Sequence, residues 1–380
     1  MTIKGLRRAV AVVAWMMLTL NAFGQLPAYV MAPADATPKP GFGSLSRYTV
    51  TSESLGADIV VDVWLPEGYG SSEAVRYPVI YAQDGQNLFD PDYTFAGVAW
   101  ELDQTCDRLY ASGDIDIQPI IVGINNRGSE GLRPSDYFPE KSLEYIPESE
   151  MPYTHIYTTC GGAFLGDEYA RFVAEELKPM IDALYRTNPA PSRTFAMGSS
   201  MGALASLYLM CEYPETFGGA ACLSTHWIGS LDLNPDYSMN DDEVCATAIL
   251  DYLRDALPSA GSHRLYLDQG TTGWDASYLV YEAEARRIAR AHGYSESEGS
   301  LLIYDAKGAG HNEWFWQQRV DRPLRFLLSF RNSALSDVIF DNAADCRRVY
   351  DLNGNVFSLD AMVSLPSGIY IVNGRKVWHR

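Results

Sequence analysis

The sequence predicts an α/β fold in which helices cover both faces of a mostly parallel central sheet, followed by a small all-β tail. Three observations favour this class. Short apolar runs typical of buried strands alternate with helical patterns along most of the 380 residues. The composition, with 47% hydrophobic and 20% charged residues, is that of a globular protein. The last forty residues instead carry closely spaced turns between alternating segments, which is typical of hairpins.

The first residues have the layout of a secretory signal peptide. Three basic residues precede an apolar run over residues 9–20, and small residues follow at Ala22 and Gly24. That run is too short to span a bilayer, and no later run is long and apolar enough to do so. We therefore expect a signal peptide over residues 1–24, a proline-rich linker over residues 25–45, and a secreted or cell-surface protein that is periplasmic in transit.

The chain is strongly acidic. Its formal net charge is −19, and without the three basic residues of the leader it becomes about −22. Such a body disfavours nucleic acid and anionic membrane surfaces as partners, because like charges repel. Neutral sugars or esters fit it better as ligands, and we expect no integral membrane segment.

The six cysteines show no metal-binding spacing. They form neither a CxxC motif nor a zinc pattern, so we expect no metal and no cofactor. Export would permit disulfides, and the sequence favours buried thiols with room for one disulfide whose connectivity it does not give. The cysteines are Cys106, Cys160, Cys211, Cys222, Cys245 and Cys346.

The first half of the main domain, which we place at residues 46–335, opens with strands. Apolar patterns predict strands and one helix before a long segment over residues 127–165, which is rich in Pro, Tyr and Glu and lacks periodicity. We expect this segment to be a loop on the substrate side. The predicted strands cover residues 57–66, 77–85 and 118–126, and the predicted helix covers residues 97–113.

The second half alternates regularly between helices and strands. Consecutive parallel strands need helical crossovers, and ligand sites in such sheets lie at the carboxyl ends of the strands. The predicted helices cover residues 166–187, 201–214, 277–293 and 313–330, and the predicted strands cover residues 193–197, 217–225, 263–270 and 300–308.

Residues Gly198 to Gly202 read "GSSMG" and satisfy the pattern G-x-S-x-G. The pattern alone is weak, but here it lies between a predicted strand and a predicted helix. A strand-to-helix elbow holds its central residue in a strained conformation, and the flanking glycines avoid clashes. The central residue is Ser200, which we expect to be a nucleophile, with Ser199 as a small supporting residue.

A serine nucleophile needs a positioned base and an acid that orients it. Of six histidines, only His311 lies in a glycine-rich loop after the last strand, where this fold places its base. The acid should follow the strand over residues 263–270, which leaves Asp268 at the strand end and Asp275 farther out. We favour Asp275, because a carboxylate there can reach the His311 loop.

The oxyanion hole needs two backbone N–H groups directed at the developing charge. We expect one from Met201, directly after the nucleophile, and one from Gln86, in the turn after the strand at residues 77–85. Further side chains follow strand ends and are expected to line the substrate site: Asp84, His226 and Trp227.

With these residues in place, the chain resembles the putative esterase family of α/β-hydrolases, which includes feruloyl and acetyl-xylan esterases, enterobactin-type esterases and esterase D. The likeness covers roughly residues 46–330 and is carried by "YAQDGQNLFD", "GDEYARFVAEELKPMID", "MGSSMGALASLY" and "HNEW". The resemblance implies a three-layer α/β-hydrolase sandwich, with the nucleophile on Ser200, the base on His311 and the acid on Asp275. Ala203 stands where relatives have the last glycine of "SMGG".

The tail over residues 341–380 looks like the C-terminal sorting domain of type IX secretion cargo, through "YDLNGN" and "LPSGIYIVNGRKV". This resemblance implies export across the outer membrane and the secretion machinery as a partner.

We therefore expect a secreted serine esterase that cleaves acyl groups from carbohydrate or related small esters. Two other functions stay open. The same site could transfer the acyl group to a sugar acceptor instead of water, or the fold could serve a non-catalytic carbohydrate-binding surface protein. An intact serine, histidine and acid argue against the last, because a binding module does not need all three.

Overall fold

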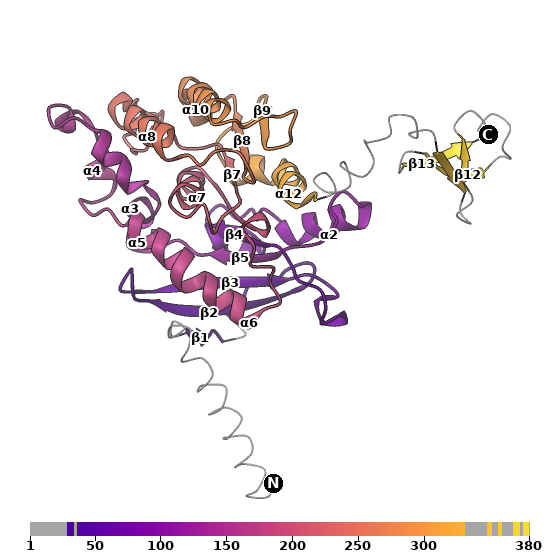
Figure 1. Ribbon diagram of the computed structural model, residues 1–380. Coiled ribbons are helices and arrows are strands. Elements are labelled where there is room, and N and C mark those ends of the chain that lie inside the picture. Colours follow the sequence, from indigo (N-terminus) through magenta and orange to yellow (C-terminus); the bar gives the residue numbers. More distant parts are fainter. Residues whose placement is uncertain are drawn as a thin grey trace, which may run out of the picture. The chain divides into compact units, whose positions relative to one another are not determined.

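The computed structural model describes residues 29–33 and 36–330, together with the backbone of four strands near the C-terminus. The chain divides into two units, Met1–Leu328 and Ser329–Arg380, each of which is described by itself. The first unit contains one nine-stranded sheet with helices on both of its faces (Figure 1). The predicted α/β class is confirmed.

The sheet has the strand order β1-β2-β3-β5-β4-β6-β7-β8-β9. The first three strands pair antiparallel with their neighbours, and every pairing from β5 to β9 is parallel. The strands are β1 (Tyr29–Met31), β2 (Ser44–Ser52), β3 (Ala57–Leu65), β4 (Val79–Gln83), β5 (Ile120–Ile124), β6 (Thr194–Ser199), β7 (Gly219–Leu223), β8 (Arg264–Gly270) and β9 (Leu301–Ala306).

Two groups of helices enclose this sheet (Figure 1). Helix α12 contacts α2, while α5, α7, α8 and α10 contact one another in series. The longer helices are α2 (Leu102–Ser112), α5 (Gly166–Arg171), α6 (Lys178–Leu184), α7 (Met201–Glu212), α8 (Glu243–Ala256), α10 (Leu279–Ala291) and α12 (Asp321–Leu328), with a π-helical segment (Phe172–Leu177) between α5 and α6. The short α-helices are α3 (Arg133–Tyr137), α4 (Ile156–Thr159), α9 (Trp274–Ser277) and α11 (Glu313–Gln317).

The central strands β4, β5, β6 and β7 are buried at every position. A strand covered on both faces has no solvent side, which explains why these strands read as continuous apolar runs in the sequence. Their register aligns the carboxyl ends: Ser199 pairs with Leu223, and Leu223 pairs with Asp268. The loops that follow β6, β7 and β8 therefore begin side by side at one edge of the sheet.

Several elements differ from the sequence prediction. The helix expected from residue 97 begins only at Leu102, and the last helix is divided into α11 and α12. Strand β2 and helix α8 were not predicted. The segment over residues 127–165 is not one irregular loop, because it contains α3, α4 and three 3₁₀ turns. The 3₁₀ turns of the first unit are Tyr69–Ser71, Gly85–Asn87, Pro91–Tyr93, Gly128–Glu130, Glu140–Tyr145, Met151–Tyr153 and Pro191–Arg193.

The predicted signal peptide and Cys346 lie outside the described residues. The five cysteines within them are buried free thiols, so none of these five forms the disulfide that export would permit. Among the described residues, no helix has both the length and the apolar character needed to cross a membrane. In the second unit the backbone forms an antiparallel sheet in the order β11-β10-β12-β13, with strands β10 (Arg348–Asp351), β11 (Val356–Ser358), β12 (Gly368–Val372) and β13 (Arg375–His379).

Candidate active site

Ser200 lies at the sharp turn between β6 and α7, with backbone angles of φ 56° and ψ −127°. Few residues other than glycine adopt a positive φ, so this conformation is held by its surroundings. A Cβ atom on Gly198 would lie 2.4 Å from the backbone oxygen of Gly202, and a Cβ atom on Gly202 would lie 3.0 Å from Asp84 Oδ2. A side chain at position 198 would thus clash with the backbone of this turn, whereas one at position 202 would crowd the Asp84 and Gln83 side chains.

Ser200, His311 and Asp275 form a continuous line of hydrogen bonds. His311 Nε2 lies 2.8 Å from Ser200 Oγ, and His311 Nδ1 lies 2.6 Å from Asp275 Oδ1. His311 belongs to the loop between β9 and α11, and Asp275 belongs to the short helix α9 that follows β8. Three separate connections at the carboxyl edge of the sheet therefore meet at one point, and the structure brings these three side chains together.

The carboxylate of Asp275 is fully buried and accepts hydrogen bonds on both oxygens. Oδ1 faces His311, while Oδ2 accepts from the Gly270 N–H at 2.6 Å and from the Ser224 hydroxyl at 2.6 Å. Burial alone would raise the pKa of Asp275. The hydrogen bond and positive charge of His311, together with the hydrogen bonds from Ser224 and Gly270, have a larger and opposite effect. The pKa of Asp275 is therefore below its ordinary value. The group is an anion at neutral pH.

Asp268, the alternative acid, makes different contacts. Its carboxylate forms a two-pronged ion pair with Arg319, at 3.0 Å for both bonds, and accepts from the Tyr266 hydroxyl at 2.7 Å. Both members of the pair are buried. The structure brings Asp275 to His311 and places Asp268 behind it, against Arg319.

A cavity of about 860 Å³ opens above Ser200 and His311. Its lining combines amide and guanidinium groups with aromatic side chains. The lining includes Asp84, Gln86, Asn87, Tyr93, Phe95, Asn125, Asn126, Arg133, Trp274, Glu313 and Trp316. The aromatic side chains can bind rings by stacking, and the polar ones can bind hydroxyl groups.

Asp84 lines this cavity as predicted, but its carboxylate is committed to protein partners. It accepts two bonds from Arg133 at 2.7 Å each and one from the Asn126 amide. Its backbone adopts φ 56°, and its N–H donates to the Tyr137 hydroxyl at 3.0 Å. Arg133, which lies within the segment expected to be a substrate-side loop, thus neutralises a buried acid on the cavity wall.

The two predicted oxyanion donors belong to the turns after β6 and β4. Met201 is the first residue of α7, where the N–H has no acceptor inside the helix. Gln86 lies in the 3₁₀ turn after β4 and lines the cavity, and its side-chain Oε1 accepts from the Asn126 N–H at 3.2 Å.

His226 and Trp227 do not line the cavity, which corrects the expectation from the sequence. Both are fully buried, because the chain turns inward after β7. The Trp227 indole donates to Glu282 Oε2 at 2.7 Å. His226 Nε2 lies 2.8 Å from the Ser230 carbonyl, which can only accept, so Nδ1 accepts from the Tyr278 hydroxyl at 2.6 Å. Burial, followed by the charge of His311, lowers the pKa of His226 to about 3.

Sequence reasoning missed Ser224, Arg319 and Arg133. Ser224 had a usable signal, since it directly follows β7 at the edge where ligand sites lie. Arg319 had none, because it lies in a predicted helix whose orientation the sequence does not give. Among the described residues, no three His, Cys, Asp or Glu side chains are arranged to hold a metal ion.

A model of one protein family matches most of the chain. Residues 52–327 match the family described as "Putative esterase". An "Endo-1,4-beta-xylanase/feruloyl esterase" of Xylanibacter ruminicola is 27% identical over 185 residues, which cover 48% of this chain and only 22% of that relative. The "Uncharacterized protein YbbA" of Bacillus subtilis is 25% identical over 301 residues, which cover 77% of this chain and 99% of that protein.

Solved structures share the fold. A ferulic acid esterase aligns with a TM-score of 0.54 and 20% identity, covering 76% of this chain and 99% of that one. An enterobactin esterase from Shigella flexneri aligns with a TM-score of 0.53 and 15% identity, covering 77% of this chain and 61% of that one. At these identities the likeness establishes the three-layer α/β architecture.

Proposed function

From the premise that this chain belongs to the putative esterase family, and is therefore a carboxylic ester hydrolase, we propose that Ser200, His311 and Asp275 are its nucleophile, base and orienting acid. The observation that carries the proposal is the line of hydrogen bonds from Ser200 Oγ through both nitrogens of His311 to Asp275. A nucleophile within reach of a base, with the base held by a third group, is the arrangement that activates a serine hydroxyl.

The reaction proceeds through an acyl-enzyme. The Ser200 oxygen attacks the ester carbonyl while its proton passes to His311 Nε2, and Asp275 stabilises the resulting imidazolium through Nδ1–H. When the tetrahedral intermediate collapses, Nε2 returns that proton to the departing alcohol. Water then attacks the acyl-enzyme, gives a proton to Nε2, and releases the acid as Ser200 recovers its hydrogen.

The backbone N–H groups of Met201 and Gln86 would hold the negative oxygen of the intermediate. Met201 directly follows Ser200 at the start of α7, and Gln86 lies in the turn after β4 and lines the same cavity as Ser200. Donors fixed in place before the reaction stabilise the developing charge without a cost of reorganisation.

The substrate that best fits the cavity is an ester with a carbohydrate or other ring-bearing part. Phe95 is 91% exposed, which is unusual for an aromatic side chain, and Trp314, which adjoins the lining residue Glu313, is 52% exposed. Exposed aromatic rings offer flat apolar faces on which sugar or aromatic rings stack. Relatives named as feruloyl or ferulic acid esterases support this substrate class, and the acidic chain favours an uncharged ester. The leader-like residues 1–24 and the tail support export to the cell surface or medium.

Replacement of Ser200 by Ala tests the catalytic role. We expect S200A to fold normally and to lose hydrolysis of p-nitrophenyl acetate, because nothing else supplies the attacking oxygen. Ser135→Ala is a control for the loss of a serine hydroxyl, since Ser135 donates one hydrogen bond to the Cys160 carbonyl and does not line the cavity. Retention of a tenth of the wild-type activity by S200A would exclude the proposed nucleophile.

A panel of acetylated and feruloylated xylan fragments tests the substrate. We expect Phe95→Ala to raise KM for these fragments while leaving hydrolysis of p-nitrophenyl acetate unchanged. Equal KM values for wild type and variant on every fragment would remove the stacking role of Phe95. Product analysis with an added sugar alcohol separates hydrolysis from acyl transfer, because a transferase would acylate that alcohol.

A further inference from the structure

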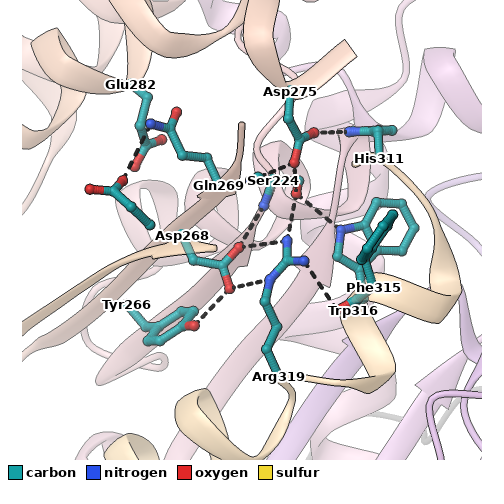
Figure 2. Close-up of polar contacts among 12 residues, drawn as sticks. Ser224, Tyr266, Asp268, Gln269, Asp275, Glu282, His311, Phe315, Trp316 and Arg319 are labelled. Carbon is teal, nitrogen blue, oxygen red and sulfur yellow. Dashed lines mark hydrogen bonds and ion pairs between the residues drawn. The ribbon is translucent and has the colours of Figure 1, made fainter. Parts of the chain in front are cut away.

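Next to Asp275 lies a buried cluster formed by Ser224, Asp268, Arg319 and Trp316, of which Trp316 also packs against His311 (Figure 2). We propose that Ser224, fixed in place by the Arg319–Asp268 ion pair, is a positioning residue that orients Asp275 toward His311. This inference rests on the function proposed above, and it assigns to the same reaction three side chains that do not line the cavity, Ser224, Asp268 and Arg319.

The hydrogen-bonding capacity of the Ser224 hydroxyl permits one arrangement. Its oxygen lies 3.0 Å from the Trp316 indole nitrogen and 2.7 Å from Arg319 Nη2, and both of those groups can only donate. A hydroxyl has two acceptor sites and one hydrogen, so these two bonds fill its acceptor sites. The remaining hydrogen must point to Asp275 Oδ2, which lies 2.6 Å away.

The backbone of Ser224 is held as firmly as its side chain. Its φ is 45°, in a region that non-glycine residues seldom adopt. Its N–H contacts both the Asp268 carbonyl, at 2.9 Å, and Asp268 Oδ1, at 3.1 Å. Ser224 therefore joins two carboxylates: its amide bonds Asp268, and its hydroxyl bonds Asp275.

Arg319 supplies the charge that makes this arrangement stable. Two buried carboxylates so close together would repel, and its guanidinium neutralises one of them through bonds to both Asp268 oxygens. The same Nη2 also donates to Ser224 Oγ. Only a guanidinium offers donors in this planar fork, so lysine could not replace Arg319 here.

Trp316 extends the effect of Ser224 to the cavity. Its indole donates to Ser224, and its ring packs edge-to-face on His311 with centroids 5.0 Å apart at 83°. One hydroxyl thus fixes both the carboxylate that orients His311 and the ring that flanks it. Without that hydroxyl, Asp275 Oδ2 would keep only the Gly270 N–H, and the carboxylate could rotate away from His311.

Ser224→Ala removes the hydroxyl and little volume. We expect kcat for p-nitrophenyl acetate to fall by about 10²-fold, as a small misplacement of a catalytic group can cause, while KM changes little. Ser135→Ala, the matched buried serine, should leave both constants unchanged. A wild-type kcat in Ser224→Ala would overturn the inference.

A second pair of variants separates positioning from stability. Arg319→Met leaves Asp268 charged and unpaired, so both Tm and kcat should fall. Adding Asp268→Asn removes the unpaired charge and should recover much of the Tm, yet kcat should stay low, because Ser224 has still lost its Arg319 donor. Recovery of kcat in parallel with Tm would show a merely structural role and would overturn the inference. Arg286→Met is a control outside this cluster. It removes the ion-pair partner of the buried Glu282 and should lower Tm without lowering kcat.

Failure of the inference can be distinguished from failure of the proposed function by including S200A. If S200A is inactive and Ser224→Ala is normal, only the positioning role is wrong. If S200A is active, the catalytic assignment itself is wrong.

Discussion

Asp275→Asn probes the relay between acid and base with almost no change in shape. In the wild type, Asp275 Oδ2 accepts from Gly270 N–H and Ser224 O–H, and neither donor can reverse its role. The amide oxygen of asparagine must therefore occupy the Oδ2 position, and its NH₂ group must face His311. Nδ1 of His311 would then accept a hydrogen bond, which places the ring hydrogen on Nε2.

A histidine with its hydrogen on Nε2 cannot take the proton of Ser200, which lies 2.8 Å from that nitrogen. The opposite amide orientation would set NH₂ against two donors and lose both bonds, so the inactive tautomer should dominate. By analogy with the same change in other serine hydrolases, we expect kcat to fall by about 10⁴-fold. That factor corresponds to a barrier increase of about 5 kcal/mol.

The assay is steady-state hydrolysis of p-nitrophenyl acetate at neutral pH, with Tm measured alongside. Asp242→Asn is a control for kcat, because Asp242 is also buried and does not line the cavity. Its two oxygens accept from the Cys245 and His155 N–H groups, so the asparagine amide loses one of these bonds, and Tm should fall while kcat stays unchanged. A kcat for Asp275→Asn within tenfold of wild type, at an unchanged Tm, would refute the proposed role of Asp275.

Three further predictions concern stability and reactivity. Folding lowers the pKa of His226 from its ordinary value of 6.5 to about 3. As the pH falls below 6.5, the unfolded chain binds a proton at this residue before the folded protein does. The free energy of unfolding therefore decreases as the pH falls from 6.5 toward 3. Between pH 6.5 and 4.5 this loss is about 2 kcal/mol, and the urea unfolding free energy of His226→Gln should not show it. Equal pH slopes for wild type and variant would contradict the assignment. Gly198→Ala places a methyl carbon against the Gly202 oxygen. We expect the free energy of unfolding to fall by about 1–3 kcal/mol, with a lower Tm and a loss of activity. A wild-type Tm would exclude the steric role of Gly198. The five buried thiols should resist iodoacetamide in the native protein, because burial raises their pKa values, for example that of Cys160 to about 12. In urea they should all react without added reductant. Peptide mapping by mass spectrometry would detect a disulfide among them, which would contradict this prediction.

The sequence could predict the parts of the site that depend on chain order. The buried strands read as apolar runs because both faces of β4 to β7 are covered, and their loops are known to meet at one edge of the sheet. Helix α8 also has a signal in the sequence, because Asp242 caps it and Cys245, Ile249 and Leu253 recur at helical spacing on its buried face.

The remaining parts depend on contacts between segments far apart in the chain. His226 follows a strand, as a site residue would, yet positive φ angles at Ser224 and Gly229 turn the chain inward and bury it beside Tyr278. In the structure Arg319, which lies between α11 and α12, pairs with Asp268, whereas Asp275 contacts His311. No local pattern records such a pairing.

The most direct test of the central claim is to identify the residue that a fluorophosphonate probe labels. The proposed mechanism predicts one label per chain, on the peptide that contains Ser200, and none in S200A. Labelling of a different serine, or undiminished labelling of S200A, would contradict it.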